Sequence, residues 1–132
     1  MIKFQSINKK FGQTIALDNI NLDIKQGEFI FLVGPSGAGK STLLRVLTKE
    51  ILPTSGKTLV GDKDIDKLKS KDIPNYRRKI GFIFQDFKLL DDRTVFEQVA
   101  LSLEVREIME KEIEKQVEHI LKLVEIWDKR NL

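Results

Sequence analysis

The 132-residue sequence contains no cysteine and only one histidine, His119. The absence of cysteine excludes a disulfide framework and a thiolate metal site, and it fits a reducing compartment. The longest apolar run has about five or six residues, far below the roughly 18 that indicate a membrane-spanning helix. The first residues, MIKFQSINKK, lack a continuous apolar stretch, which predicts that no signal peptide is present.

Charge of one sign does not dominate any part of the chain. The formal net charge is +3 and the sequence pI is near 9.1, which by itself makes nucleic acid a candidate partner. Between Asp62 and Lys79, however, seven basic residues are mixed with four acidic ones and with one aromatic, Tyr76. We interpret this segment as a solvated face and expect no nucleic-acid partner.

Several short stretches predict strands. In residues 15–24, Ile20, Leu22 and Ile24 alternate with polar residues, which indicates a half-buried strand. Residues 29–33 (FIFLV) and 80–84 (IGFIF) are apolar at every position apart from Gly81, as the central strands of a parallel sheet are. Further strands are expected at 2–7, before a polar turn at 8–13, and within 57–65.

Three segments predict longer helices. Residues 41–49 are expected to bury Leu43, Leu44, Val46 and Leu47. Thr94 and Glu97 form a capping-box signature, and the apolar face of the helix that follows contains Val95, Phe96, Val99, Ala100 and Leu103. A later helix places Ile113, Val117, Ile120, Leu121 and Val124 at helical spacing. Strands that alternate with helices favour an α/β fold.

The stretch GPSGAGKS matches the pattern G-x-x-x-x-G-K-S/T and lies between an apolar strand and a helix. Glycines let the backbone approach a triphosphate closely, and free amides at a helix start, with about half a positive charge from the helix dipole, attract it. The lysine reaches the β- and γ-phosphates and the serine hydroxyl ligates Mg²⁺. The expected nucleotide-binding residues are Gly34, Pro35, Ser36, Gly37, Ala38, Gly39, Lys40, Ser41 and Thr42.

Three features resemble the ATP-binding subunits of ABC transporters. They are the long lead-in TIALDNINLDIKQGEF, the aromatic Phe11 before Gly12, and the region IGFIFQDFKLLDDRTVFEQV. The resemblance implies an α/β P-loop NTPase fold of the ABC type, with an N-terminal antiparallel β-subdomain, an incomplete core sheet and part of a helical subdomain. It divides the chain into a lead-in at 1–28, a P-loop core at 29–86 and the start of the helical subdomain at 87–132.

The same resemblance implies roles for two residues outside the glycine-rich loop. Phe11 falls where the family stacks an aromatic ring on adenine, although a core aromatic of the β-subdomain is the alternative. Gln85 falls at the Q-loop position, where the amide ligates Mg²⁺, orients water and senses the γ-phosphate. The resemblance therefore implies ATP and Mg²⁺ as cofactors, Lys40 and Gln85 as catalytic residues, and Ser41 and Gln85 as metal ligands.

Within the family the sequence is most similar to the cell-division type, FtsE. This implies a polytopic, FtsX-like membrane subunit as partner, docked through the region after Gln85, and a second copy of the subunit that pairs on ATP binding. It also implies a location at the cytoplasmic face of the plasma membrane. The apolar run Phe87–Leu90 is a candidate partner-facing surface, with packing between subdomains as the alternative.

Three elements of the family pattern are absent from these residues: an apolar strand followed by Asp-Glu, the signature LSGGQ, and the switch histidine. His119 lies among helical residues and is interpreted as a surface residue. The resemblance therefore implies that the chain corresponds to the N-terminal part of a longer ATPase and binds ATP without turning it over. The alternatives are the ATPase of a lipoprotein- or macrolide-exporting transporter, a binding module without turnover, and a P-loop nucleotide kinase, which shares GPSGAGKST.

Overall fold

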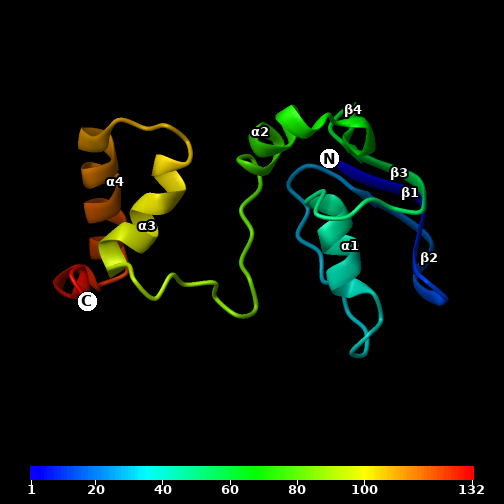
Figure 1. Cartoon of the computed structure of the whole chain (residues 1–132), viewed down its shortest axis with the longest axis horizontal. Coiled ribbons are helices and arrows are strands. Elements are labelled where there is room, and N and C mark those ends of the chain that lie inside the picture. The colour runs from blue at the N-terminus through cyan, green and yellow to red at the C-terminus, as the bar shows by residue number, and fades with distance from the viewer. The chain divides into compact units, whose positions relative to one another are not determined.

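The computed structural model describes residues 1–132 and divides them into two compact units, Met1–Ile80 and Gly81–Leu132. The first unit contains an antiparallel sheet and α1, and the second contains α3 and α4 (Figure 1). An α/β fold is therefore confirmed. Each unit has its own buried cluster, so each is described separately.

The sheet of the first unit has four strands in the order β2-β1-β3-β4, and all neighbours are antiparallel. The strands are β1 (Ile2–Phe11), β2 (Thr14–Ile24), β3 (Ser55–Val60) and β4 (Lys63–Asp64). β2 agrees with its predicted range. The turn expected at 8–13 is confirmed at Gly12 and Gln13, but it is shorter than predicted, because β1 runs on to Phe11 and pairs with Thr14. Polar side chains at 8–10 did not prevent their backbone from joining the ladder, since one face of an antiparallel sheet can stay in water.

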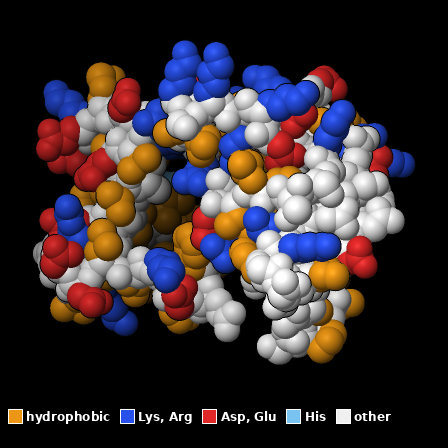
Figure 2. Space-filling model, turned by 45° about the vertical axis from the view of Figure 1, so that its right-hand side comes forward, with side chains coloured by type: hydrophobic (Ala, Val, Ile, Leu, Met, Phe, Trp, Pro, Cys, Tyr) orange, Lys and Arg blue, Asp and Glu red, His pale blue; other side chains and the backbone are white.

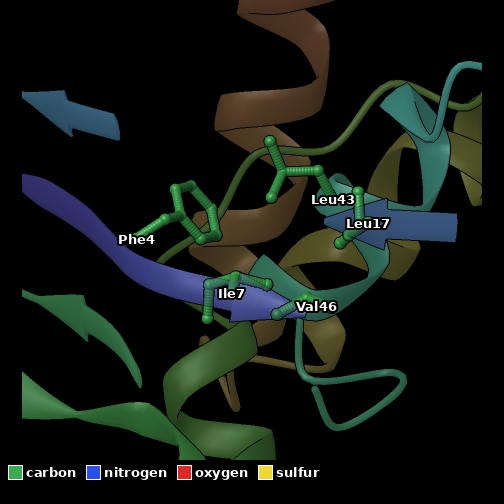
Figure 3. Packing of buried hydrophobic residues seen from close by; sticks show 5 residues of the cluster. All are labelled: Phe4, Ile7, Leu17, Leu43 and Val46. Carbon is green, nitrogen blue, oxygen red and sulfur yellow. The ribbon is translucent and has the colours of Figure 1, made fainter. Parts of the chain in front are cut away.

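The core of this unit forms between the sheet and α1 (Lys40–Leu47). Phe4 and Ile7 from β1 and Leu17 from β2 pack against Leu43 and Val46 of α1 (Figure 3). Burying a side chain of this size contributes about 1.5–3 kcal/mol, so the five residues are a main source of the stability of the unit. The expectation that Leu44 is buried is wrong, because it is 41% exposed and does not belong to this cluster.

The two segments expected to form central parallel strands, 29–33 and 80–84, lie outside all strands of the structure. Phe29, Phe31 and Val33 are each at least 80% exposed, and Ile83 is 95% exposed. A strand that is apolar on both faces needs partner strands at its edges and a packed layer over each face. The antiparallel sheet of this chain does not extend to either segment, and both predictions are wrong for the structure described here.

Short helical turns follow the sheet: η1 (Ile65–Lys67), η2 (Ser70–Asp72) and α2 (Ile73–Arg77). Pro74 lies in the first turn of α2, where a proline is tolerated because its missing N–H would have no partner within the helix. The Asp66 carboxylate accepts a hydrogen bond of 2.6 Å from the Thr58 amide of β3. Burial raises the pKa of Asp66, and the Thr58 amide opposes that shift. These contacts join the turns to the sheet.

The second unit is a helical hairpin of α3 (Val95–Glu104) and α4 (Glu110–Leu123), followed by η3 (Trp127–Lys129). The capping box at Thr94 and Glu97 is confirmed. The predicted apolar face of α3 packs on Ile113, Val117 and Leu121 of α4. The expectation that Ile120 and Val124 join this face is wrong, because they are 43% and 53% exposed and do not belong to the cluster.

The surface mixes charges of both signs, and basic and acidic side chains lie among one another on the face shown in Figure 2. Within the segment 62–79, Lys67 pairs with Asp64 at 3.5 Å. None of the helices combines the length and the apolar character that crossing a membrane requires.

Candidate nucleotide-binding site

The glycine-rich loop leads directly into α1, whose first residue is Lys40. Gly37 has a φ of +80° and Gly39, the N-cap, has a φ of +85°. These left-handed conformations turn the backbone sharply just before the helix, a geometry that glycine adopts without strain. The loop therefore leads directly into the start of α1, which has a partial positive charge.

Two carbonyl groups of the glycine-rich loop hold the Lys40 ammonium. Its Nζ donates to the Gly34 carbonyl and to the Pro35 carbonyl, at 2.7 Å each. A lysine head group has three protons to donate, so one donor is left after these two contacts. The geometry places a cation over the same backbone that supplies the amides.

Most of the loop amides are free to bind a ligand. The Ala38 amide donates to the Pro35 carbonyl at 3.2 Å, and the Leu43 amide donates to the Gly39 carbonyl at 2.9 Å. The amides of Gly37, Gly39 and Ser41 make no hydrogen bond within the protein. Free amides at the beginning of a helix are anion-binding groups, and together with the Lys40 ammonium they can surround a polyphosphate.

The position of the loop is set by a close approach to β2. A Cβ atom at Gly39 would lie 2.3 Å from the Ala16 carbonyl oxygen and 2.9 Å from Leu17 Cδ2. At Gly37, by contrast, a Cβ atom would meet nothing within 4 Å. Gly39 therefore seats the loop on the strand, whereas Gly37 only provides a turn.

Phe11, the predicted base-stacking residue, lies at the end of β1 and is 45% exposed. It is not part of the buried cluster between the sheet and α1, so the alternative interpretation as a core aromatic finds no support. The Lys9 ammonium lies 5.0 Å from the centroid of the Phe11 ring. The strand that pairs with Phe11 is β2, on which the loop rests through Gly39.

The predicted metal ligands lie in different units. Ser41, in the first turn of α1, is exposed and belongs to the first unit, whereas Gln85 is exposed in a turn of the second unit. Their joint role as Mg²⁺ ligands therefore stays a prediction. Next to Gln85, Asp86 pairs with Lys88 at 2.5 Å, and the hydrogen bond from Lys88 lowers the pKa of Asp86.

The structure has no group of three or more His, Asp or Glu side chains arranged to hold a metal ion. His119 lies exposed on α4, as the sequence predicts for a surface residue. The exposed Ser41 hydroxyl offers an oxygen of the kind that Mg²⁺ binds, and Mg²⁺ is usually held through substrate phosphates with few protein ligands.

Sequence reasoning missed two features that support this site. Lys9 stands two residues before Phe11, and this spacing in a strand could have indicated that the two side chains meet. Tyr76 and Arg77 bind the carbonyls at the far end of α1: the Tyr76 hydroxyl donates to Leu47, and the Arg77 guanidinium donates to Thr48 and Lys49. No short sequence pattern signals that contact.

A family model described as ABC transporter matches residues 17–132 of this chain. Among curated proteins, a methionine import ATP-binding protein, MetN, of Francisella tularensis subsp. holarctica is 44% identical over 99% of the chain and 39% of its own length. The cell division ATP-binding protein FtsE of Bacillus subtilis is 45% identical over 98% of the chain and 57% of its own length.

Among solved structures, the ATP-binding cassette MJ0796, in a dimeric post-hydrolysis state bound to ADP and Pi, superimposes with a TM-score of 0.86 and 36% identity. The match covers 99% of this chain and 60% of the cassette. The chain thus spans less than two thirds of each of these relatives.

Proposed function

Because the chain belongs to the ABC transporter ATP-binding family, we propose that it is the nucleotide-binding part of an ATP-binding subunit that serves a membrane complex. The observation that supports this proposal is the loop geometry, in which the Gly34 and Pro35 carbonyls hold the Lys40 ammonium while other amides of the glycine-rich loop are free. In this proposal residues 1–28 are the β-subdomain lead-in, 29–86 the P-loop core and 87–132 the start of the helical subdomain.

Each residue of the loop has a separate task in binding ATP. The backbone from Gly34 to Gly39 would wrap the phosphates, Lys40 would offset the charge of the β- and γ-phosphates, and the Ser41 hydroxyl would hold Mg²⁺. When bound, Mg²⁺ would neutralise phosphate charge. Phe11 stacks on the base, and Gln85 is the proposed second metal ligand and water-positioning group.

Replacing the lysine tests the phosphate site. Lys40→Ala removes a charge-assisted contact worth about 1.5–3 kcal/mol, so the ATP dissociation constant should rise by roughly one to two decades. Lys57→Ala, at an exposed position of β3, is the matched control and should leave the affinity unchanged. Calorimetry that shows undiminished ATP binding by Lys40→Ala would overturn the assignment of the site.

We propose that these 132 residues bind ATP without hydrolysing it. Hydrolysis of a phosphoanhydride needs a group that positions water and a carboxylate that holds the metal, and the residues present lack the apolar strand followed by Asp-Glu. Binding by calorimetry combined with a phosphate-release assay tests this proposal. Steady-state release of phosphate by the purified chain, abolished by Lys40→Ala, would contradict it.

The family match also bears on the alternative that the chain is part of a P-loop nucleotide kinase. It extends over residues 80–99, beyond the glycine-rich loop that the chain shares with nucleotide kinases, and this favours the transporter ATPase. A kinase would transfer the γ-phosphate to a nucleoside monophosphate, so the expected result is that no GDP forms from ATP and GMP. Formation of GDP would restore the kinase alternative.

We propose that the segment after Gln85 contacts a polytopic membrane subunit and that ATP joins two copies of the ATPase subunit. Phe87 and Leu89 are 79% and 67% exposed, as a docking surface requires, and the cassette MJ0796 was solved as a dimer. Leu89→Asp in the full subunit should weaken co-purification with its membrane subunit. Unchanged co-purification would favour a packing role for this run.

Two biological contexts compete, because the FtsE and MetN relatives are 45% and 44% identical to the chain. We propose the cell-division type, with an FtsX-like partner at the cytoplasmic face of the plasma membrane. Deleting the gene in its host should then delay cell separation and leave methionine uptake unchanged. Loss of methionine uptake with normal cell separation would assign the protein to methionine import.

A further inference from the structure

Lys9 makes two contacts that together fix the surroundings of Phe11. Its ammonium lies 5.0 Å from the centroid of the Phe11 ring. The same nitrogen donates a hydrogen bond of 2.7 Å to the Leu52 carbonyl, in the loop between α1 and β3. A cation within about 6 Å of an aromatic face is attracted by the negative charge density of that face. The Phe11 ring is therefore covered by a cation on one face.

The carbonyl contact makes this arrangement more than a chance approach of a flexible side chain. A free lysine chain loses up to about 2 kcal/mol of rotamer entropy when it is held in one position. The Leu52 hydrogen bond offsets part of that loss, since bonds to charged groups are the stronger ones. Lys9 is also half-buried, whereas the neighbouring Lys10 is exposed. The ring thus has one occupied face, and the residue is still 45% exposed.

The β1–β2 ladder connects Lys9 and Phe11 to the glycine-rich loop. Lys9 pairs with Leu17 in the β1–β2 ladder, and Leu17 and its neighbour Ala16 are the residues on which Gly39 rests. The hairpin that carries the Phe11 ring is therefore the one that seats the loop. A ligand held by the loop through phosphates can present its other end to this hairpin.

We propose that Lys9 is a positioning residue for the base of the nucleotide. It holds the Phe11 ring by one face and leaves the opposite face for a planar, electron-rich ligand, with a purine as the expected class. The cation also draws electron density from the ring, which strengthens stacking on such a base. This inference rests on the proposed function, in which Phe11 stacks on adenine.

The test separates the base from the phosphates. The dissociation constants of ATP and of inorganic tripolyphosphate are measured by calorimetry for Lys9→Met, which keeps the apolar stem and removes the charge. ATP should bind about two- to fivefold more weakly, as the loss of an exposed cation–π contact predicts, while tripolyphosphate binding stays unchanged. Lys9→Arg should restore ATP binding, and Lys10→Met is the matched control that should change neither constant.

Two results would overturn the inference. One is ATP binding by Lys9→Met at the wild-type level, and the other is an equal loss of ATP and tripolyphosphate, which would assign Lys9 to the phosphates or to folding. Phe11→Ala distinguishes failure of the inference from failure of the proposed function. If Phe11→Ala weakens ATP binding and Lys9→Met does not, only the role of Lys9 is wrong. If Phe11→Ala has no effect, stacking on Phe11 is wrong as well.

Discussion

The Tyr76 hydroxyl donates a hydrogen bond of 2.5 Å to the Leu47 carbonyl, which ends α1. The last carbonyls of a helix have no partner within the helix, and Tyr76 supplies one from α2. Arg77 serves the next two carbonyls, with bonds of 2.9 Å to Thr48 and 3.0 Å to Lys49. The helix that begins at the phosphate loop is thus held at its other end by two consecutive side chains of α2.

Titration of Tyr76 measures how far the phenol is buried where it meets the end of α1. Burial, with a smaller effect of the Asp66 charge, raises the pKa of Tyr76 to about 12. Tyr76 is the only tyrosine in the chain, so the absorbance of tyrosinate near 295 nm reports this residue alone. We expect a midpoint near pH 12 in the folded protein, against about 10 in urea. A folded-state midpoint at the ordinary value would show that the Tyr76 hydroxyl is not buried in solution as it is in the structure.

The raised pKa of Tyr76 also determines how the stability of the protein changes with pH. A raised pKa means that the folded state holds the phenolic proton more tightly than the unfolded state. The stabilisation is therefore complete below about pH 10 and is lost as the pH rises toward 12. Tyr76→Phe should remove this pH dependence and cost about 1 kcal/mol of unfolding free energy at neutral pH. Urea denaturation of the wild-type protein and of Tyr76→Phe at pH 7 and at pH 11 measures the pH dependence and the loss of unfolding free energy.

Gly39 and Gly37 form a matched pair for testing how the loop is seated. Both have a φ near +80°, so replacement by alanine costs a similar strain of about 1 kcal/mol at each. Only Gly39→Ala also places a methyl group against the Ala16 carbonyl of β2. We expect Gly39→Ala to lower both stability and ATP affinity well beyond Gly37→Ala. Equal losses in urea denaturation and in calorimetry would contradict the close approach.

The parts of the fold that the sequence could predict are those governed by local chemistry. The capping box at Thr94, the alternation in β2 and the loop before Lys40 all depend on neighbouring residues. The length of β1, and whether residues 29–33 form a strand, depend instead on which partner strands are available. The periodicity of the sequence does not identify these partners. The contacts from Tyr76 to Leu47 join residues 29 positions apart, and no local pattern encodes them.

The same division applies to the candidate site. The phosphate loop could be found from its spacing, because amides, glycines and lysine act within eight consecutive residues. Lys9 and its carbonyl partner Leu52 are 43 residues apart, so only the fold shows that the cation is tethered. The role of Gln85 depends on its distance from the loop, which no pattern within the sequence determines.

The capping box of α3 makes a stability prediction for the second unit. The Thr94 hydroxyl accepts from the Glu97 amide at 3.2 Å, and the Glu97 carboxylate accepts from the Thr94 amide at 2.8 Å. Thr94→Ala should cost about 1 kcal/mol, whereas Ser102→Ala, a hydroxyl loss in the last turn of the same helix, should cost much less. Thermal denaturation followed by circular dichroism compares the two, and equal losses would contradict the capping role.

Glu97 also makes the stability of the α3 capping box sensitive to acid. The hydrogen bonds from Thr94, amide first, lower the pKa of Glu97. A lowered pKa gives stability that is present above the ordinary value of a glutamate and is lost as the pH falls through the folded value. Carboxyl chemical shifts should show Glu97 titrating below the ordinary value of a glutamate in the wild-type protein, and closer to that value in Thr94→Ala. Titration of Glu97 at the ordinary value in the wild-type protein would mean that the capping box does not form in solution.

The exposed apolar segments predict association between chains. Phe31 is 80% and Ile83 is 95% exposed, each within a run of apolar residues that has no strand partner, and such runs pair readily with other chains. We expect the apparent mass in light scattering to rise with concentration, and Phe31→Lys and Ile83→Lys to reduce that rise because a charge in the run opposes pairing. Leu123→Lys changes an equally apolar residue on α4, 70% exposed, and should reduce it less. A monomer at every concentration, or an equal effect of all three variants, would show that these runs are not the associating surface.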